Sequence, residues 1–212
     1  MTDEFPIARS RMVERLRAKA LAGEEVLAAM EELPRHLFVD PALAPRAYRE
    51  DALPIGQGQT LSQPETVAFM SESLQLKPGL RVLEVGTGSG YQSALLAMLG
   101  AELWTVERLG ALLDKARAAW GLLGLAERIR SRVDDGYRGW LEAAPFARIL
   151  VTAAPSALPP ALLDQLAEGG LMVLPLLDQG KQRLIRLRME GNRAYREDLG
   201  SCEFVPMRAR VG

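Results

Sequence analysis

The chain has 212 residues, 48% of them hydrophobic, with 26 basic against 27 acidic side chains and a net charge of −1. This length and composition predict one compact unit, or at most two domains, with a sizeable hydrophobic core. The balanced charge gives no general attraction to nucleic acids or anionic membranes, so neither partner is expected. No apolar stretch approaches the roughly 20 residues that a membrane-spanning helix needs.

Cysteine and histidine each occur once, as Cys202 and His36. A single cysteine excludes an intramolecular disulfide, and the N-terminus lacks the cationic start and apolar run of a signal peptide, so a cytoplasmic location is predicted. A multi-histidine metal centre is excluded, and no metal is expected. Any serine or cysteine nucleophile activated by histidine would have to use His36, which disfavours that chemistry.

The first seventy or so residues are predicted to be mostly helical. Two helices are indicated by apolar residues at helical spacing, first Met12, Val13 and Leu16, then Val26, Met30 and Leu33. Residues 40–64 are rich in proline and glycine and predict a long ordered loop, a feature typical of functional segments. The segment SQPE (62–65) has the pattern of a helix start, with Ser62 as the N-cap and Glu65 as its capping-box partner.

Beyond Lys77-Pro78-Gly79, short apolar runs alternate with helical segments, which is typical of β-α units on a parallel sheet. Strands are predicted at 81–85, 102–107, 129–133, 148–153 and 171–176, and helices at 91–99, 112–122 and 160–166. Antiparallel strands are expected at 182–190, 193–199 and 203–207, with Gly191-Asn192 in a turn between them. The sequence predicts an N-terminal helical and active-site-loop region over 1–78 and a core over 79–212, together forming one compact unit.

The strongest local signal is the segment VLEVGTGSGYQ (82–92), in which a strand runs into Gly86, Gly88 and Gly90 and then into a helix. Glycines allow a sharp turn and a close approach of a ligand to the backbone, and the start of the helix offers free N–H groups. The spacing matches neither the dinucleotide pattern G-x-G-x-x-G nor a phosphate-binding loop. We predict a nucleotide-type cradle at the carboxyl end of a strand; a plain strand-to-helix turn is the alternative.

Acidic residues near the cradle indicate which nucleotide it takes. Glu107 closes the second strand, where a ribose-binding acid is expected and where a carboxylate would repel a 2′-phosphate. Glu84 adds a second negative charge, which suits a cationic ammonium or sulfonium better than a pyrophosphate. The turn Asp134-Asp135-Gly136 offers an acceptor for an adenine amine, although alone it is an ordinary turn. Together these residues indicate S-adenosylmethionine as the cofactor.

Five stretches are distinctive: PRHLFV (34–39), AYREDALPIGQGQTLSQP (47–64), LEVGTGSGYQSALLA (83–97), VTAAPSALPPALLDQLAEGG (151–170) and FVP (204–206). Through them the chain resembles the protein-L-isoaspartate (D-aspartate) O-methyltransferase family from about Leu21 to Pro206. The glycine cradle indicates only a methyltransferase, whereas LPIGQGQTLSQP (53–64) narrows the resemblance to this family.

The resemblance implies an α/β, Rossmann-like, S-adenosylmethionine-dependent methyltransferase fold, with a mixed seven-stranded sheet, helices on both faces and an N-terminal helical extension. It implies methyl transfer from S-adenosylmethionine to the free carboxylate of L-isoaspartyl residues in damaged proteins and peptides. The methyl ester then collapses to a succinimide, which begins repair. A monomeric enzyme is expected.

The resemblance also implies roles for particular residues. Six fall in the cofactor site: Glu84, Gly86 and Gly88 in the loop, Glu107 at the ribose hydroxyls, and Asp135 with Gly136 beside the adenine. Ser62, with Thr60 close by, falls on the active-site serine. Contact with substrate and a helix cap are competing hypotheses for the Ser62 hydroxyl.

So sparse a site is sufficient for this reaction. A carboxylic acid with a pKa near 4 is already ionised at pH 7, and the leaving group is a neutral thioether, so positioning is what remains for the protein to do. Three departures from the family pattern are Asp134 in place of glycine, Ala147-Arg148 in place of an aspartate, and Glu65 in place of an aromatic or histidine. Glu65 would repel an anionic substrate unless its charge is used by the helix.

Two other functions remain as alternatives. One is a methyltransferase of a small molecule or a nucleic acid. A nucleic-acid target predicts clustered arginines, and Arg183, Arg186 and Arg188 do alternate on one segment. The other is a non-catalytic protein that keeps the cofactor fold.

Overall fold

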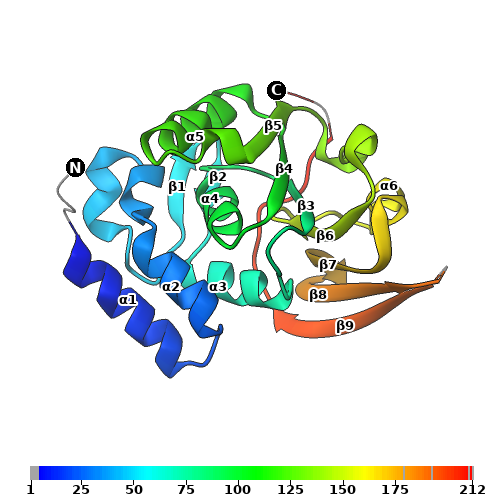
Figure 1. Ribbon diagram of the computed structural model, residues 1–212, viewed down its shortest axis with the longest axis horizontal. Coiled ribbons are helices and arrows are strands. Elements are labelled where there is room, and N and C mark those ends of the chain that lie inside the picture. Colours follow the sequence, from blue (N-terminus) through cyan, green and yellow to red (C-terminus); the bar gives the residue numbers. More distant parts are fainter. Residues whose placement is uncertain (1–4, 179, 192, 210, 212) are drawn as a thin grey trace.

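A computed structural model describes residues 5–178, 180–191, 193–209 and 211 (Figure 1). Its centre is a seven-stranded sheet in the order β5-β4-β3-β6-β7-β8-β9. The strands are β3 (Arg81–Val85), β4 (Glu102–Glu107), β5 (Ile129–Val133), β6 (Phe146–Val151), β7 (Leu166–Asp178), β8 (Lys181–Glu190) and β9 (Arg193–Ser201). The strands from β3 to β7 pair in parallel, whereas β8 and β9 pair antiparallel, so the predicted mixed seven-stranded sheet is confirmed.

Helices cover both faces of this sheet. They are α1 (Pro6–Ala18), α2 (Glu24–Glu32), α3 (Pro64–Ser73), α4 (Tyr91–Met98), α5 (Gly110–Leu122) and α6 (Pro160–Asp164). A separate two-stranded antiparallel sheet, β1 (Leu53–Gly56) with β2 (Gln59–Leu61), stands within the predicted loop of residues 40–64. Within the described residues, no helix combines the length and the apolar character needed to cross a membrane.

The core consists of two apolar clusters, one on each face of the sheet. Because side chains alternate along a strand, Val82 and Leu103 point into the larger cluster while their neighbours Leu83 and Trp104 point into the smaller one. The larger cluster is covered by residues of α1 to α5, and the smaller one by α6 and the turn at 141–143. The predicted helices on both faces are therefore confirmed.

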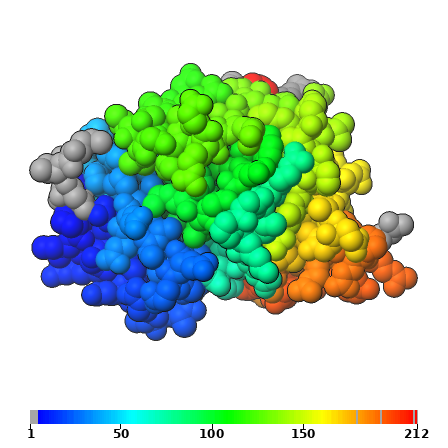
Figure 2. Space-filling view, viewed as in Figure 1, coloured from blue at the N-terminus to red at the C-terminus, as the bar shows by residue number. Residues whose placement is uncertain are grey.

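The N-terminal helices share the larger cluster with the sheet. The six apolar residues expected to be buried in α1 and at α2 are all buried: Met12, Val13, Leu16, Val26, Met30 and Leu33. In the space-filling view the N-terminal helices and the core form a continuous surface (Figure 2). The division of the chain at residue 78 stays a prediction, because this shared packing gives no boundary there.

The prediction of an antiparallel strand at 203–207 is wrong. This segment instead crosses the end of β6, where the Ala154 N–H donates to Val205 O (2.8 Å) and the Met207 N–H donates to Ala154 O (2.7 Å). Pro206 lies between these bonds in an isolated parallel bridge to Ala154, and because it has no N–H it cannot pair with a second strand on its other side. The predicted hairpin of β8 and β9 is confirmed, but Asn192 of its turn lies outside the described residues.

The C-terminal end of α3 is held by two arginines from the sheet. Arg148 donates from Nε to Leu74 O and from Nη2 to Gln75 O (3.2 Å), and Arg186 donates from Nη1 to Ser73 O (3.2 Å). These carbonyls are among those that a helix end leaves without intrahelical partners. The departure at Ala147-Arg148 therefore serves the anchoring of α3, which begins at the site described next.

Candidate active site

A cleft opens where the strand order reverses, at the carboxyl ends of β3, β4 and β6. Strand β3 lies between β4 and β6, and open parallel sheets bind ligands at such a switch point. The cleft and its open mouth together enclose about 910 Å³ of space not filled by protein atoms. Most of its wall comes from five segments: Gln59 to Ser62, Val85 to Ser89, Val106 to Arg108, Thr152 with Ala153, and Val205 to Arg208. Val67, Met70, Gln92 and Gly136 complete the lining.

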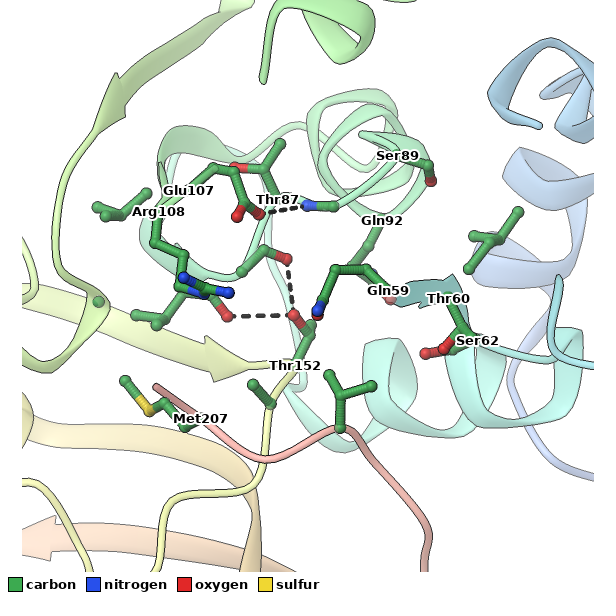
Figure 3. Close-up of a pocket in the computed structure, with 18 of the residues that line it drawn as sticks. Gln59, Thr60, Ser62, Thr87, Ser89, Gln92, Glu107, Arg108, Thr152 and Met207 are labelled. Atoms are coloured by element: carbon green, nitrogen blue, oxygen red, sulfur yellow. Dashed lines mark hydrogen bonds between the residues drawn. The ribbon is translucent and has the colours of Figure 1, made fainter. Parts of the chain in front are cut away.

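The glycine turn after β3 forms one wall, and its geometry requires glycine. Gly86 has φ +97°, and a Cβ there would overlap Oγ1 of Thr152. The Thr152 hydroxyl donates to the Gly86 carbonyl (2.6 Å) and so fixes the turn against β6 (Figure 3). Gly136, which also lines the cleft, has no room for a Cβ because Val85 packs against it. A ligand can therefore approach bare backbone on this side.

Glu107 stands at the end of β4 with its carboxylate held in place. Its Oε2 accepts from the Gly88 N–H (2.8 Å) and its Oε1 accepts from the Leu109 N–H (3.0 Å). In the described part of the chain no lysine or arginine forms an ion pair with it. Each carboxylate oxygen can accept more than one hydrogen bond, so acceptor sites remain for a pair of ligand hydroxyls.

Glu84 lies behind the wall of the cleft rather than on it. Its side chain is fully buried, and its Oε2 accepts from the hydroxyls of Ser93 and Thr105. Thr105 is also 2.6 Å from the Thr87 hydroxyl, which lines the cleft. When Glu84 is ionised, the Thr105 hydroxyl donates its hydrogen bond to the carboxylate. In the bond between the two threonines, Thr87 is therefore the donor and Thr105 the acceptor.

Burial has the largest effect on the pKa of Glu84. It raises the pKa of this carboxyl to about 7; the bonds from Ser93 and Thr105 act in the opposite direction, and the charge of Glu107 adds to the rise. Its Oε1 is buried and has no hydrogen-bond partner among the described residues. Glu84 thus titrates near neutrality beneath the cofactor loop.

The turn after β5 is shaped by its two aspartates. Asp135 accepts from the Tyr137 N–H (3.0 Å) and caps the short turn that begins at Gly136, which lines the cleft although Asp135 does not. Asp134, the departure from the family pattern, pairs with Arg132 at 3.2 Å. The extra acid is therefore used in an ion pair on the far side of this turn.

A second groove joins the cleft. It runs between the start of α3 and the segment that follows β9, and its walls include Leu21, Gln63, Glu65, Phe69, Leu184 and Phe204. Four residues line both cavities: Thr60, Ser62, Thr152 and Val205. In Figure 3, Thr60 and Ser62 lie together at one end of the cleft, while Glu107 and Arg108 lie at the other. The structure thus brings the two predicted catalytic residues to the junction of the cavities.

The prediction that Ser62 caps α3 is wrong. The helix begins at Pro64, its N-cap is Gln63, and no side chain caps it. A residue before proline is disfavoured in the α conformation, and Gln63 is extended, with φ −57° and ψ 152°, which moves the helix start one residue later. Among the described residues, nothing forms a hydrogen bond with the Ser62 hydroxyl. It is available to a ligand.

Glu65 likewise takes no part in a capping box. Its carboxylate pairs with Lys19, which follows α1. Lys19 also lies 4.0 Å from Glu50, which in turn pairs with Arg15. The negative charge of Glu65 at the groove is therefore balanced by the N-terminal helical region.

Several lining residues were not predicted from the sequence. They are Gln59, Thr87, Gln92, Arg108, Thr152, Met207 and Arg208. Arg108 directly follows the predicted strand at 102–107, and Thr152 lies near the end of the predicted strand at 148–153, so position at a strand end was the available signal. The C-terminal residues could not be found in this way, because their approach to the cleft depends on the bridge to Ala154.

The sheet order, the glycine turn and the acid at the end of β4 define a Rossmann-like fold of the S-adenosylmethionine-dependent methyltransferase class. Two solved structures share it. One is titled protein-L-isoaspartate O-methyltransferase, with TM-score 0.86 and 25% identity over 96% of this chain and 67% of that one. The other is the Plasmodium falciparum protein of the same description, in complex with S-adenosyl-L-homocysteine, with TM-score 0.84 and 23% identity over 94% of this chain and 98% of that one.

Similarity of the amino-acid sequence to known proteins identifies the family. The pattern described as Protein-L-isoaspartate(D-aspartate) O-methyltransferase (PCMT) matches residues 8–212. The protein-L-isoaspartate O-methyltransferase of Halorhodospira halophila is 50% identical over 201 residues, covering 94% of this chain and 90% of that one. That of Dictyoglomus thermophilum is 43% identical over 211 residues, covering 100% and 96%. The chain belongs to the protein-L-isoaspartate (D-aspartate) O-methyltransferase family.

The buried Glu84 predicts a pH-dependent stability. Its pKa is about 7 in the folded chain against 4.5 for an unperturbed carboxyl, so between these values the folded state holds a proton that the unfolded state has lost. Its contribution to stability therefore falls as pH rises through this window. Glu84→Gln has no such proton to lose. When the pH rises from about 5 to about 8, the difference in unfolding free energy between this variant and the wild type should therefore shift by roughly 3 kcal/mol in favour of the variant.

Urea unfolding at both pH values measures this difference. Glu102→Gln, at the exposed start of β4, is the control for the substitution itself. An unchanged difference between the Glu84 variant and the wild type at the two pH values would show that Glu84 does not titrate in this range.

Proposed function

We propose that this chain is a protein-L-isoaspartate O-methyltransferase that transfers the methyl group of S-adenosylmethionine to the free carboxylate of L-isoaspartyl residues in damaged proteins and peptides. The observation that carries the proposal is the junction of a nucleoside-type cleft with an open groove at Thr60 and Ser62. Family membership over residues 8–212 supports the same reaction.

The cleft suits S-adenosylmethionine, which supplies the methyl group as an electrophile on a sulfonium. Glu107 is placed to accept from the two ribose hydroxyls, because both of its oxygens are already oriented by backbone N–H groups. Gly86 and Gly88 allow close approach along the loop, and Gly136 borders the adenine side. We assign Glu84 an indirect role, through Thr105 to Thr87, rather than a contact.

The groove suits a peptide substrate. An isoaspartyl carboxyl is ionised at neutral pH and attacks without a general base. The hydroxyls of Ser62 and Thr60 donate to this carboxylate and hold one oxygen in line with the methyl group. The resulting methyl ester collapses spontaneously to a succinimide. A site built for positioning has no need of the single histidine, His36, which bonds through Nδ1 to the Tyr48 hydroxyl (2.7 Å) and lines neither cavity.

The arginines that favoured a nucleic-acid target are paired with acids. Arg183 bonds Asp198 at 2.8 Å, Arg186 bonds Glu197 at 2.6 Å, and Arg188 lies 3.8 Å from Glu190. Phosphate binding needs cations whose charge is free. These contacts favour a peptide over a nucleic acid; the monomeric state and the cytoplasmic location stay predictions.

Methyl transfer to a matched pair of peptides tests the function. Labelled S-adenosylmethionine is mixed with two peptides that differ only in an L-isoaspartyl or an L-aspartyl linkage. Methylation of the first alone is the expected result. If neither is methylated although calorimetry shows that the cofactor binds, the substrate assignment is wrong; if the cofactor does not bind either, the chain is not a methyltransferase.

Ser62→Ala tests the contact with substrate. Loss of one hydrogen bond to a charged group costs about 1.5–3 kcal/mol, so kcat/KM for the isoaspartyl peptide should fall by roughly 10- to 100-fold. The thermal midpoint should not change, because the hydroxyl caps nothing. Ser156→Ala, at an exposed position after β6, is the matched control. A loss of stability with full kcat/KM would reject the contact.

The pair Lys19–Glu65 predicts an electrostatic effect on substrate binding. Lys19→Met leaves the Glu65 charge unbalanced beside an anionic substrate, so KM for the peptide should rise about two- to fivefold at low salt. Lys19→Met with Glu65→Gln should restore it. If the double variant binds the peptide as weakly as Lys19→Met, the charge of Glu65 is not the cause.

A further inference from the structure

One arginine in the N-terminal region is buried, and no acid among the described residues pairs with it. Arg35 belongs to the stretch PRHLFV, on a short turn at Arg35–Phe38, and its side chain is 0% exposed. Burial lowers its pKa, and the side chains of Tyr91 and Tyr48 act in the opposite direction. Removing a cation from water costs several kcal/mol unless its surroundings replace the lost solvation. The contacts that Arg35 makes must therefore offset this cost.

Those contacts join three segments that are distant in sequence. Its Nε donates to the Ala47 carbonyl (2.8 Å), and its Nη2 donates to the Ser62 carbonyl (2.5 Å). Its guanidinium carbon lies 4.7 Å from the centre of the Tyr91 ring. Ala47 precedes β1, Ser62 lies between β2 and α3, and Tyr91 is the first residue of α4, directly after the glycine turn.

On the substrate side, Arg35 is the contact that orients Ser62. Ser62 lies in the two-residue link between β2, which ends at Leu61, and α3, which begins at Pro64. Neither a side-chain cap nor a hydrogen bond from its own hydroxyl fixes Ser62 among the described residues. The bond to its carbonyl therefore sets the peptide plane from which the side chain projects into the cavity junction.

On the cofactor side, Arg35 packs against a residue that cannot move independently of the glycine turn. Tyr91 is 0% exposed and follows Gly90, whose φ is +86° and whose carbonyl accepts from the Trp120 indole N–H (2.9 Å). A rigid guanidinium with two bonded nitrogens and a stacked face can fix a distance in a way that a flexible ammonium cannot.

We propose that Arg35 is a positioning residue that holds Ser62 at the junction of the two cavities, at a fixed distance from the glycine turn, by binding the Ser62 carbonyl while stacking on Tyr91. This proposal rests on the proposed function and on the contact of Ser62 with substrate. It assigns a role to the PRHLFV stretch, which otherwise contributes no group to either cavity wall at this junction.

A double-mutant cycle separates positioning from general stability. In Arg35→Lys, kcat/KM for the isoaspartyl peptide should fall about tenfold or more, because a single ammonium nitrogen on a flexible stem cannot reproduce the planar, forked contact. If Arg35 acts through Ser62, the same substitution in a Ser62→Ala background should change kcat/KM by less than twofold. Calorimetric affinity for S-adenosylhomocysteine should stay within threefold of wild type in all variants.

Arg148→Lys is the matched control. This arginine also binds backbone carbonyls of the α3 region, at the opposite end of the helix, and it lines neither cavity. It should lower the thermal midpoint without a selective loss of kcat/KM, and any effect should be equal in the wild-type and Ser62→Ala backgrounds. Thermal midpoints measured for every variant ensure that the assays compare folded chains.

Additive losses in the Arg35→Lys and Ser62→Ala cycle would overturn the proposal, since Arg35 would then act independently of Ser62. If Arg35→Lys does not fold, Tyr91→Leu removes the stacked ring but leaves both carbonyl contacts; the proposal requires its loss of kcat/KM also to vanish in the Ser62→Ala background. A wild-type chain that methylates neither peptide would overturn the proposed function as well. An active wild type whose activity survives Ser62→Ala would overturn the contact of Ser62 with substrate and the positioning role, but not the proposed function.

Discussion

The left-handed turn after β3 is the constraint on which the rest of the site depends. Thr152 can pack against Gly86 only because this residue has no Cβ. The hydrogen bond from the Thr152 hydroxyl to the Gly86 carbonyl joins the end of β3 to the end of β6. The same turn presents the Gly88 N–H to Glu107 at the end of β4. Three parallel strands are thereby joined at one point, and the cleft, the proposed ribose acceptor Glu107 and the proposed peptide groove all take their positions from it.

The charges near this point are arranged so that few of them are free. Glu107 is oriented by backbone N–H groups, Asp134 and Glu65 are paired with Arg132 and Lys19, and Glu84 is buried beneath the loop. A substrate that arrives as an anion needs a site without unbalanced negative charge, and a reaction with a neutral leaving group needs no proton shuttle. The sparse set of titratable groups follows from both requirements.

Much of this was accessible from the sequence, because local patterns determine local structure. Strand β3, the glycine turn and the acid that closes β4 follow from hydrophobic runs and glycine spacing, and all lie within one continuous segment. The capping role of Ser62 failed because Pro64 displaced the helix start, a competition between two local rules. The strand at 203–207, the pairing of Glu65 with Lys19 and the anchoring of α3 by Arg148 depend on contacts between distant segments, which no local pattern reports.

The PRHLFV stretch shows most clearly where sequence reasoning ends. Its arginine binds carbonyl oxygens, and any residue could supply a carbonyl, so no partner motif exists to be found. The positions of Ala47 and Ser62 beside it are set by packing of the N-terminal helices on the same apolar cluster that supports α4. The N-terminal helical region is thus more than a cover for the sheet: through Arg35 and Lys19 it sets both the geometry and the charge of the groove that the peptide enters.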